Sequence, residues 1–197
     1  AAAWTDVEAA EKSSTVAFQI NALGPKAIAE ACSGVGSKFF RISTDYVFSG
    51  KVNLPLGINE PKSPRSVYGQ TKSAGEDFVL AGFPDGSFIF RTAWLYSQSG
   101  NNFAKKMVRA ALMNDSVISV VDDQLGQPTS AKDLENKIIE SVDKNLQPGI
   151  YHATNSGQGS WNEFAREVFR LVGKDPSRVL KVKSSEFKTL APRPKYS

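Results

Sequence analysis

The sequence predicts an α/β fold: a parallel, doubly wound sheet covered by helices and joined to a second, smaller lobe. Two observations lead to this prediction. Short apolar runs that suit buried strands alternate with longer stretches whose apolar residues recur at helical spacing. Thr, Tyr, Trp and Asp gather directly after several predicted strands, at the edge where parallel sheets bind their ligands.

Composition narrows the class of protein. The chain has 197 residues, of which 41% are hydrophobic, enough to pack a core. Its net charge of +4 is spread without a basic run, so we expect no nucleic-acid partner. No signal peptide and no apolar run of ~18 residues is visible, so we expect no membrane contact and a cytoplasmic location. The single cysteine, Cys32, and the single histidine, His152, are expected to be structural.

The first part of the chain is predicted to be helical, after a strand end or loop at residues 1–5. A short helix at 7–12 precedes a longer one at 15–33, whose apolar residues share one face. Pro25 lies inside this longer pattern and removes a backbone hydrogen bond, so a kink or two abutting helices are expected there. Gly34 ends the pattern.

The rest of the chain alternates between strands and helices. Runs rich in β-branched and aromatic residues predict strands at 38–43, 87–92, 117–121, 149–154 and 179–182. Amphipathic stretches predict helices at 66–80, 101–113, 131–142 and 160–172. Between the first of these strands and the first of these helices, residues 49–65 are rich in Pro, Gly, Asn and Ser and predict a loop.

One constellation suits proton transfer. Thr44 follows a predicted strand, and Tyr68 and Lys72 lie one turn apart on the next predicted helix, so both can face one ligand. A free Tyr has a pKa of ~10, and a nearby ammonium group typically lowers it by ~1–3 units toward the working pH of a general acid or base. Thr44 can hydrogen-bond the same substrate oxygen, and Lys72 can also hold hydroxyls of a cofactor sugar. A Tyr-x-x-x-Lys spacing alone is weak evidence for a catalytic site, and its position on a helix after a predicted strand makes that evidence stronger.

Seven segments in order carry a family resemblance: AAAWTDV at 1–7, STDYVF at 43–48, VYGQTK at 67–72, RTAWLY at 91–96, NNF at 101–103, DDQLGQPT at 122–129 and APRPKYS at 191–197. Together they resemble the dTDP-4-dehydrorhamnose reductases, a family of the extended short-chain dehydrogenase/reductases, over essentially the whole chain. The resemblance implies a Rossmann-like fold with a substrate-binding lobe. It also implies reduction of the 4-keto group of dTDP-4-dehydro-6-deoxy-L-mannose to dTDP-L-rhamnose by NADPH, with NADH as an alternative.

The resemblance also implies residue roles. Tyr68 would donate a proton to the C4 oxygen of the sugar, Lys72 would hold the nicotinamide ribose, Thr44 would bind the same oxygen, and Asp45 would bind a neighbouring hydroxyl. The other implied contacts are those of Ala1, Ala2 and Ala3 with the cofactor, of Trp94 with the deoxysugar, and of Asn102, Gln124 and Arg193 with the nucleotide diphosphate or its base.

Structural alternatives stay open for four of these residues. Trp94 could belong to the core, Asp45 could cap the loop that follows it, and Asn102 could be the N-cap of the next helix. Arg193 lies between prolines and could simply be solvated. Trp161, at the start of a predicted helix, is expected to pack and not to bind a ligand.

The Gly-rich turn that binds the cofactor pyrophosphate in such folds is not found, so we expect the first βα units to be absent from this sequence. We expect a fragment of a longer enzyme, inactive by itself; a truncated paralogue is the alternative. Residues 1–98 and 128–155 are assigned to the dinucleotide-binding domain, and 99–127 and 156–197 to the substrate-binding lobe.

Further expectations concern partners and rival functions. The acidic position after the Pro-Thr segment is Lys132, so no metal is predicted. A dTDP-sugar is the expected partner, and a homodimer remains open. A non-catalytic binding or regulatory subunit on the same fold is one rival. A nucleotide-sugar epimerase or dehydratase is another, although dehydratases of this group commonly carry an acidic pair where this chain has Asp45 followed by Tyr46.

Overall fold

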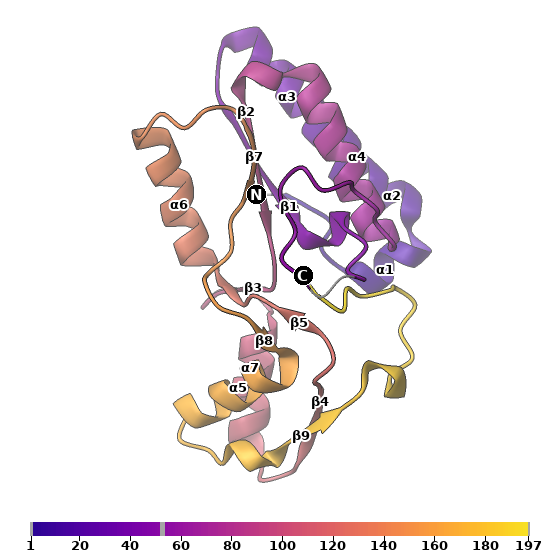
Figure 1. Ribbon diagram of the computed structural model, residues 1–197, viewed down its shortest axis with the longest axis vertical. Helices are drawn as coiled ribbons and strands as arrows, with labels where there is room; N and C mark the ends of the chain where they lie inside the picture. Colours follow the sequence, from indigo (N-terminus) through magenta and orange to yellow (C-terminus); the bar gives the residue numbers. More distant parts are fainter. Residues whose placement is uncertain (1, 52–53, 197) are drawn as a thin grey trace.

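A computed structural model describes residues 2–51 and 54–196 and shows a parallel sheet with helices on both faces (Figure 1). Its strands are β1 (Phe39–Thr44), β2 (Ser87–Thr92) and β7 (Gly149–His152), in the order β1-β2-β7. All six residues of β2 are buried, as expected for the central strand of a sheet covered on both faces. The predicted α/β fold with a doubly wound parallel sheet is confirmed.

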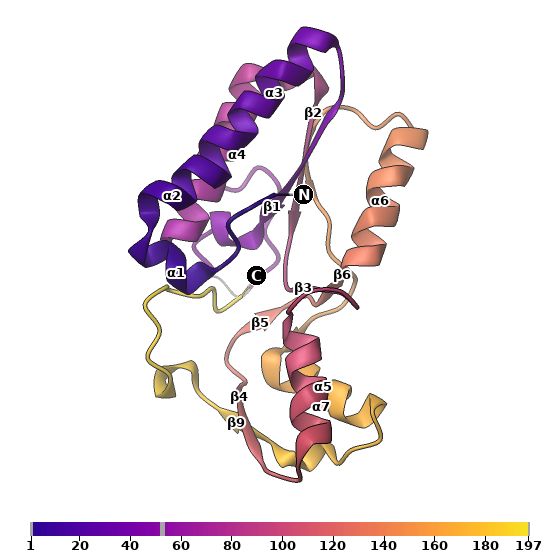
Figure 2. The same ribbon diagram turned by 180° about the vertical axis from the view of Figure 1, so that it is seen from behind.

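Two helical layers cover this sheet. Helices α3 (Gly24–Val35) and α4 (Val67–Gly82) lie on one face and α6 (Ala131–Asp143) lies on the other, which Figure 2 shows from behind. On the first face Ala29, Val79 and Ile89 form a buried cluster. On the second face the buried cluster consists of Phe88, Phe90 and Leu134. Helix α4 is therefore held directly over the strands whose ends carry the predicted reactive residues.

The N-terminal helices differ in detail from the prediction. After α1 (Val7–Lys12), the single helix expected at 15–33 is divided into α2 (Ser14–Phe18), a π-helical turn (Gln19–Leu23) and α3. The expected interruption is thus present, but it precedes Pro25, which lies in the first turn of α3, directly after the π-helical turn. Single π-turns often occur at functional sites.

A second group of elements forms the smaller lobe at the bottom of Figure 1. Helices α5 (Phe103–Met113) and α7 (Trp161–Leu171) pack against a separate parallel pair, β4 (Ile118–Val121) and β9 (Val179–Val182). Its core consists of buried residues from all four elements or their immediate neighbours, namely Ala111, Val120, Ala165, Phe169 and Val179.

Several short elements were not predicted from the sequence. They are β3 (Leu95–Tyr96) paired with β6 (Thr129–Ser130), β5 (Leu125–Gly126) paired with β8 (Gly159–Ser160), and single 3-10 turns at Asp45–Val47, Pro84–Gly86, Pro176–Arg178 and Ser184–Glu186. The C-terminal segment, yellow in Figure 1, returns from the smaller lobe toward α1. There the amide of Lys195 donates to the carbonyl of Gly50 at 3.0 Å, and its carbonyl accepts from the amide of Leu125 at 2.8 Å. Within the described ranges, no helix is both long and apolar enough to cross a membrane.

Candidate active site

The start of α4 places Tyr68 and Lys72 at the carboxyl end of the sheet. Ser66 caps this helix, its hydroxyl accepting from the amide of Gly69 at 3.1 Å, so Tyr68 lies in the first turn. The ammonium of Lys72 lies 6.0 Å from the centroid of the Tyr68 ring. It donates to the carbonyl of Ile42 in β1 at 3.2 Å, which ties the side chain to the neighbouring strand.

Thr44 brings the end of β1 to the same point. Its side chain interacts with that of Tyr68, and its hydroxyl donates to the carboxylate of Asp45 at 2.8 Å. The Thr44 oxygen also accepts from the amide of Tyr46 at 3.2 Å, which fixes the turn that follows the strand. The structure therefore gathers Thr44, Asp45, Tyr68 and Lys72 in one place, although they come from a strand end and a helix.

Burial controls the ionisation of this group. It raises the pKa of Tyr68 above its usual value; the interaction with Thr44 opposes the rise and the carboxylate of Asp45 adds to it. The sequence-based expectation of a lowered Tyr68 pKa was wrong, because burial outweighs any nearby ammonium. Burial, together with the charge of Arg41, lowers the pKa of Lys72 to about 8, against the pull of Glu76. Tyr68 is thus a protonated phenol at neutral pH, the form that a proton donor requires.

Tyr46 and Arg193 border the reactive group. The ring of Tyr46 meets that of Tyr68 edge-on, with centroids 5.4 Å apart, and burial raises the pKa of Tyr46 to about 12. Arg193 hydrogen-bonds the side chain of Tyr46 and forms an ion pair with Glu8 of α1 at 3.1 Å. The alternative that Arg193 is merely solvated is therefore wrong, since its guanidinium joins the C-terminal segment to the site.

Trp94 lies where the two groups of elements meet. Its backbone has a φ of 47°, in the left-handed region that bulky residues rarely adopt. Its ring stacks on Trp161, with centroids 3.6 Å apart and planes 9° apart, and it covers Gly126 so closely that a Cβ there would overlap the ring. Trp161 packs as predicted, and Trp94 has a packing role as well.

The remaining predicted site residues lie in other surroundings. Asn102 caps α5, accepting from the amide of Lys105 at 3.1 Å and donating to the carbonyl of Ser97 at 2.7 Å, so its capping role is confirmed. Gln124 is buried beside β5. Ala2 and Ala3 are exposed, next to Trp4, whose amide donates to Asn21 at 3.0 Å. Ala1 lies outside the described residues.

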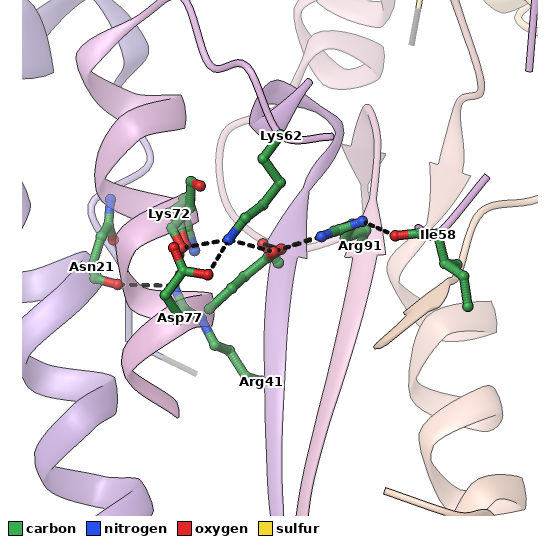
Figure 3. A network of polar contacts seen from close by, with 10 residues as sticks. Asn21, Arg41, Ile58, Lys62, Lys72, Asp77 and Arg91 are labelled. Carbon is green, nitrogen blue, oxygen red and sulfur yellow. Dashed lines mark hydrogen bonds and ion pairs between the residues drawn. The ribbon is translucent and has the colours of Figure 1, made fainter. Parts of the chain in front are cut away.

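Sequence reasoning missed a buried ionic network beneath the reactive residues (Figure 3). Glu76, one turn after Lys72, accepts from Ser43 at 2.5 Å and from both Nε and Nη2 of Arg91, at 3.0 and 2.8 Å. Arg41 donates to the carbonyls of Asn21 and Lys72, both at 2.9 Å. A signal was present, because Arg41 and Arg91 interrupt otherwise apolar strands, and a charge inside a buried strand requires a partner.

A cavity of about 180 Å³ opens beside the reactive group, at the carboxyl ends of the strands. Its lining combines polar groups with apolar ones, among them Asp45, Phe48, Leu56, Arg91, Thr92 and His152. Asp45 links this cavity to the reactive group, since Thr44, Tyr68 and Lys72 do not line it. A larger cavity of about 330 Å³, between β7 and α6, is lined by none of Thr44, Asp45, Tyr68 and Lys72. In the part of the chain that the structure describes, no three metal-ligating side chains converge.

Comparisons with known proteins agree with this geometry. The family described as RmlD substrate binding domain matches residues 1–197. The dTDP-4-dehydrorhamnose reductase of Streptomyces griseus is 46% identical over the whole chain, which covers 66% of that protein. The dTDP-4-keto-6-deoxy-D-glucose reductase of Streptomyces niveus is 41% identical over the whole chain, which covers 67% of it.

Solved structures give the same result. A dTDP-4-dehydrorhamnose reductase from Clostridium acetobutylicum shares 43% identity with a TM-score of 0.94, covering 100% of this chain and 68% of the other. The Bacillus anthracis reductase in complex with NADP shares 42% identity with a TM-score of 0.94, covering 99% of this chain and 68% of that one.

The covered parallel sheet, with Thr44, Tyr68 and Lys72 at its carboxyl edge, defines a Rossmann-like protein of the extended short-chain dehydrogenase/reductase class. More narrowly, the chain belongs to the RmlD substrate binding domain family. It spans about two thirds of the length of the first two curated relatives described above.

Proposed function

We propose that the intact protein reduces the 4-keto group of dTDP-4-dehydro-6-deoxy-L-mannose to dTDP-L-rhamnose, with hydride from NADPH. One observation carries the proposal: a protonated Tyr68 beside Thr44, with the Lys72 ammonium on the next turn of the same helix. The names of relatives at 46% and 41% identity support it, since both are reductases of dTDP-linked 4-keto sugars.

The side chains supply the proton half of this reaction. Tyr68 donates its proton to the C4 oxygen as C4 accepts a hydride, so the ketone becomes a secondary alcohol. Thr44 holds the same oxygen, and the carboxylate of Asp45 accepts from a neighbouring sugar hydroxyl. The phenolate left on Tyr68 is stabilised by the Lys72 ammonium, which lies 6.0 Å from the ring centroid, until solvent restores the proton.

The cofactor end of the site is compatible with this assignment. NADPH, with NADH as an alternative, supplies the hydride when bound. Among the described residues, the Lys72 ammonium donates to the carbonyl of Ile42, and an ammonium has three donors, so N–H groups are available for ribose hydroxyls. Ala2 and Ala3 would line the cofactor beside Trp4. The described residues proposed to hold the nicotinamide end are therefore Ala2, Ala3, Tyr68 and Lys72.

Four further side chains are proposed to contact the substrate. Trp94 would cover the deoxysugar with the part of its ring that Trp161 leaves open, and Gln124 and Arg193 would contact the nucleotide. Asn102 would reach the substrate only beside its capping role. We further propose that residues 1–98 and 128–155 belong to the dinucleotide-binding domain, that 99–127 and 156–197 belong to the substrate-binding lobe, and that the enzyme is cytoplasmic.

Replacement of the proton donor tests the proposal. In the intact protein, Tyr68→Phe should lower turnover of dTDP-4-dehydrorhamnose at least ~10²-fold, the lower end for loss of a general acid. Tyr151→Phe is the matched control, because its hydroxyl donates to the carbonyl of Gln147 at 2.6 Å and does not belong to the reactive group. Near-parental turnover of Tyr68→Phe would refute the assignment. An intact parent that gives no turnover, and no heat with NADPH or the dTDP-sugar, would favour the non-catalytic rival.

A further inference from the structure

Arg91 is a buried cation that joins three parts of the site (Figure 3). It lies in β2 with 3% of its surface exposed, next to Glu76 of α4, which has none exposed. Two of its nitrogens bind the two oxygens of Glu76 at 3.0 and 2.8 Å. This forked pairing holds the guanidinium in one orientation, which a lysine could not reproduce.

The third nitrogen of Arg91 faces the loop after β1. Its Nη1 donates to the carbonyl of Ile58 at 2.9 Å, so the orientation set by Glu76 decides where that backbone lies. A loop backbone carbonyl bound by a charged donor is held more strongly than one bound by a neutral donor. Residues 54–65, hereafter the wall segment, are therefore tied to the strand and, through Glu76, to the helix that carries Tyr68 and Lys72.

Other contacts fasten the wall segment at its two ends. Lys62 donates to the carbonyl of Ser73 at 3.1 Å and to the carboxylate of Asp77 at 2.5 Å, both on α4. The imidazole of His152 hydrogen-bonds backbone groups of Leu56 and Gly57. Arg91 lies between these two attachments and is the only one of the three cationic or imidazole side chains that is fully buried.

The wall segment matters because it closes the cavity beside the reactive residues. Pro55 and Leu56 line that cavity together with Asp45 and Phe48. The guanidinium of Arg91 lies 4.9 Å from the centroid of the Phe48 ring, so it supports a second lining residue as well. A displaced wall segment would widen the space where a sugar is to be held beside Asp45.

We propose that Arg91 is a positioning residue for the nucleotide-sugar substrate: held by Glu76, it fixes the wall segment against the cavity beside Asp45. The part of this inference that concerns the substrate rests on the proposed function. Its structural half, that Arg91 fixes the wall segment, does not. Arg91 touches neither the reacting carbonyl nor the cofactor in this scheme. It also lines the cavity, so its loss acts on sugar binding there as well as through the wall segment.

Limited proteolysis of the intact protein tests the structural half. The wall segment contains trypsin sites after Lys62 and Arg65. Arg91→Lys keeps the charge but removes the forked geometry, so cleavage after Arg65 under native conditions should accelerate at least ~10-fold, as expected for loss of a charge-assisted hydrogen bond. A folded Arg91→Lys protein with parental cleavage at this site would overturn the proposal.

Steady-state kinetics test the functional half. Arg91→Lys should raise KM for the dTDP-sugar at least ~10-fold, change kcat less than ~3-fold, and leave the Kd of NADPH within ~2-fold, because uniform substrate binding is what is lost. A kcat that falls ~10-fold while KM stays unchanged would contradict a positioning role. A parent enzyme without activity would refute the proposed function only, and proteolysis would still decide the inference.

A second variant guards against failure of Arg91→Lys to fold. Lys62→Met removes a partly exposed attachment of the same segment, with 21% of the side chain exposed. It should accelerate cleavage after Arg65 and raise KM in the same direction. Lys132→Met, which removes an exposed pair with Glu135, is the matched control and should change neither quantity. If Arg91→Lys does not fold, parental cleavage and a parental KM in a folded Lys62→Met would refute the proposal.

Discussion

Gly75 of α4 is the point where the reactive helix, Arg41 and the π-helical turn come into closest contact. A Cβ at this position would lie well inside 3.0 Å of the carbonyl oxygen of Asn21 and of both terminal nitrogens of Arg41. Because one of these atoms belongs to the main chain, the overlap cannot be relieved by rotating a side chain. Gly75→Ala should therefore force α4 away from the turn.

Two opposing effects set the magnitude. Replacing Gly by Ala inside a helix gains ~1 kcal/mol in intrinsic propensity. Overpacking of a tight interior typically costs ~1–3 kcal/mol, and here it also disturbs the bonds from Arg41 to Asn21 and Lys72, each worth ~1.5–3 kcal/mol as charge-assisted contacts. With one of these bonds lost, the cost exceeds the gain, so we expect Gly75→Ala to lower the free energy of unfolding by about 1.5–5 kcal/mol.

Urea denaturation followed by circular dichroism measures this change, and the same helix offers the control. A Cβ at Gly82 would meet only the Cγ of Glu30, at 3.7 Å, an ordinary contact. Gly82→Ala should therefore leave stability unchanged or raise it by up to ~1 kcal/mol. The reasoning would be refuted if Gly75→Ala were as stable as Gly82→Ala.

Two further predictions concern the site itself. Burial and Arg41 lower the folded pKa of Lys72 to about 8 from 10.5, so between these values the unfolded chain holds more protons and Lys72 makes the protein more stable as pH rises. The free energy of unfolding of Lys72→Met minus that of the parent should therefore be larger at pH 7.5 than at pH 10, by up to ~3 kcal/mol. Urea denaturation at the two pH values measures this difference, and a difference that does not change with pH would contradict the reasoning. Because Trp94 and Trp161 stack at 3.6 Å, Trp94→Ala and Trp161→Ala should each abolish the coupled tryptophan signal in circular dichroism and lower stability by about 2 kcal/mol or more. A retained signal in either variant would show that the rings do not stack in solution.

The main sheet and its helices were predictable because they rest on local patterns. The apolar run of β2 and the helical spacing in α4 and α6 are properties of consecutive residues, and the structure places these elements within a few residues of the predicted bounds. The π-helical turn was not predictable in the same way. It depends on Asn21, whose amide bonds Trp4 and Thr71 from distant parts of the chain.

The candidate site was predictable in its residues but not in its electrostatics. Thr44, Tyr68 and Lys72 could be inferred from a strand end and a helical turn. The direction of the Tyr68 pKa shift could not, because it depends on how deeply the ring is buried, which the spacing of residues does not reveal. The pairing of Glu76 with Arg91 was missed for a related reason: the sequence shows two charges, and only the fold shows that they share one buried space.

Isotope transfer tests the central claim most directly. The intact protein would be given dTDP-4-dehydrorhamnose and NADPH whose transferred hydrogen, at C4 of the nicotinamide ring, is replaced by deuterium. The sugar product would be analysed by NMR. We expect one deuterium at C4 of the product sugar, with at least ~10²-fold slower formation in Tyr68→Phe, since Tyr68 supplies only the proton. Product without deuterium at C4, or unchanged formation in Tyr68→Phe, would contradict hydride reduction with Tyr68 as the proton donor.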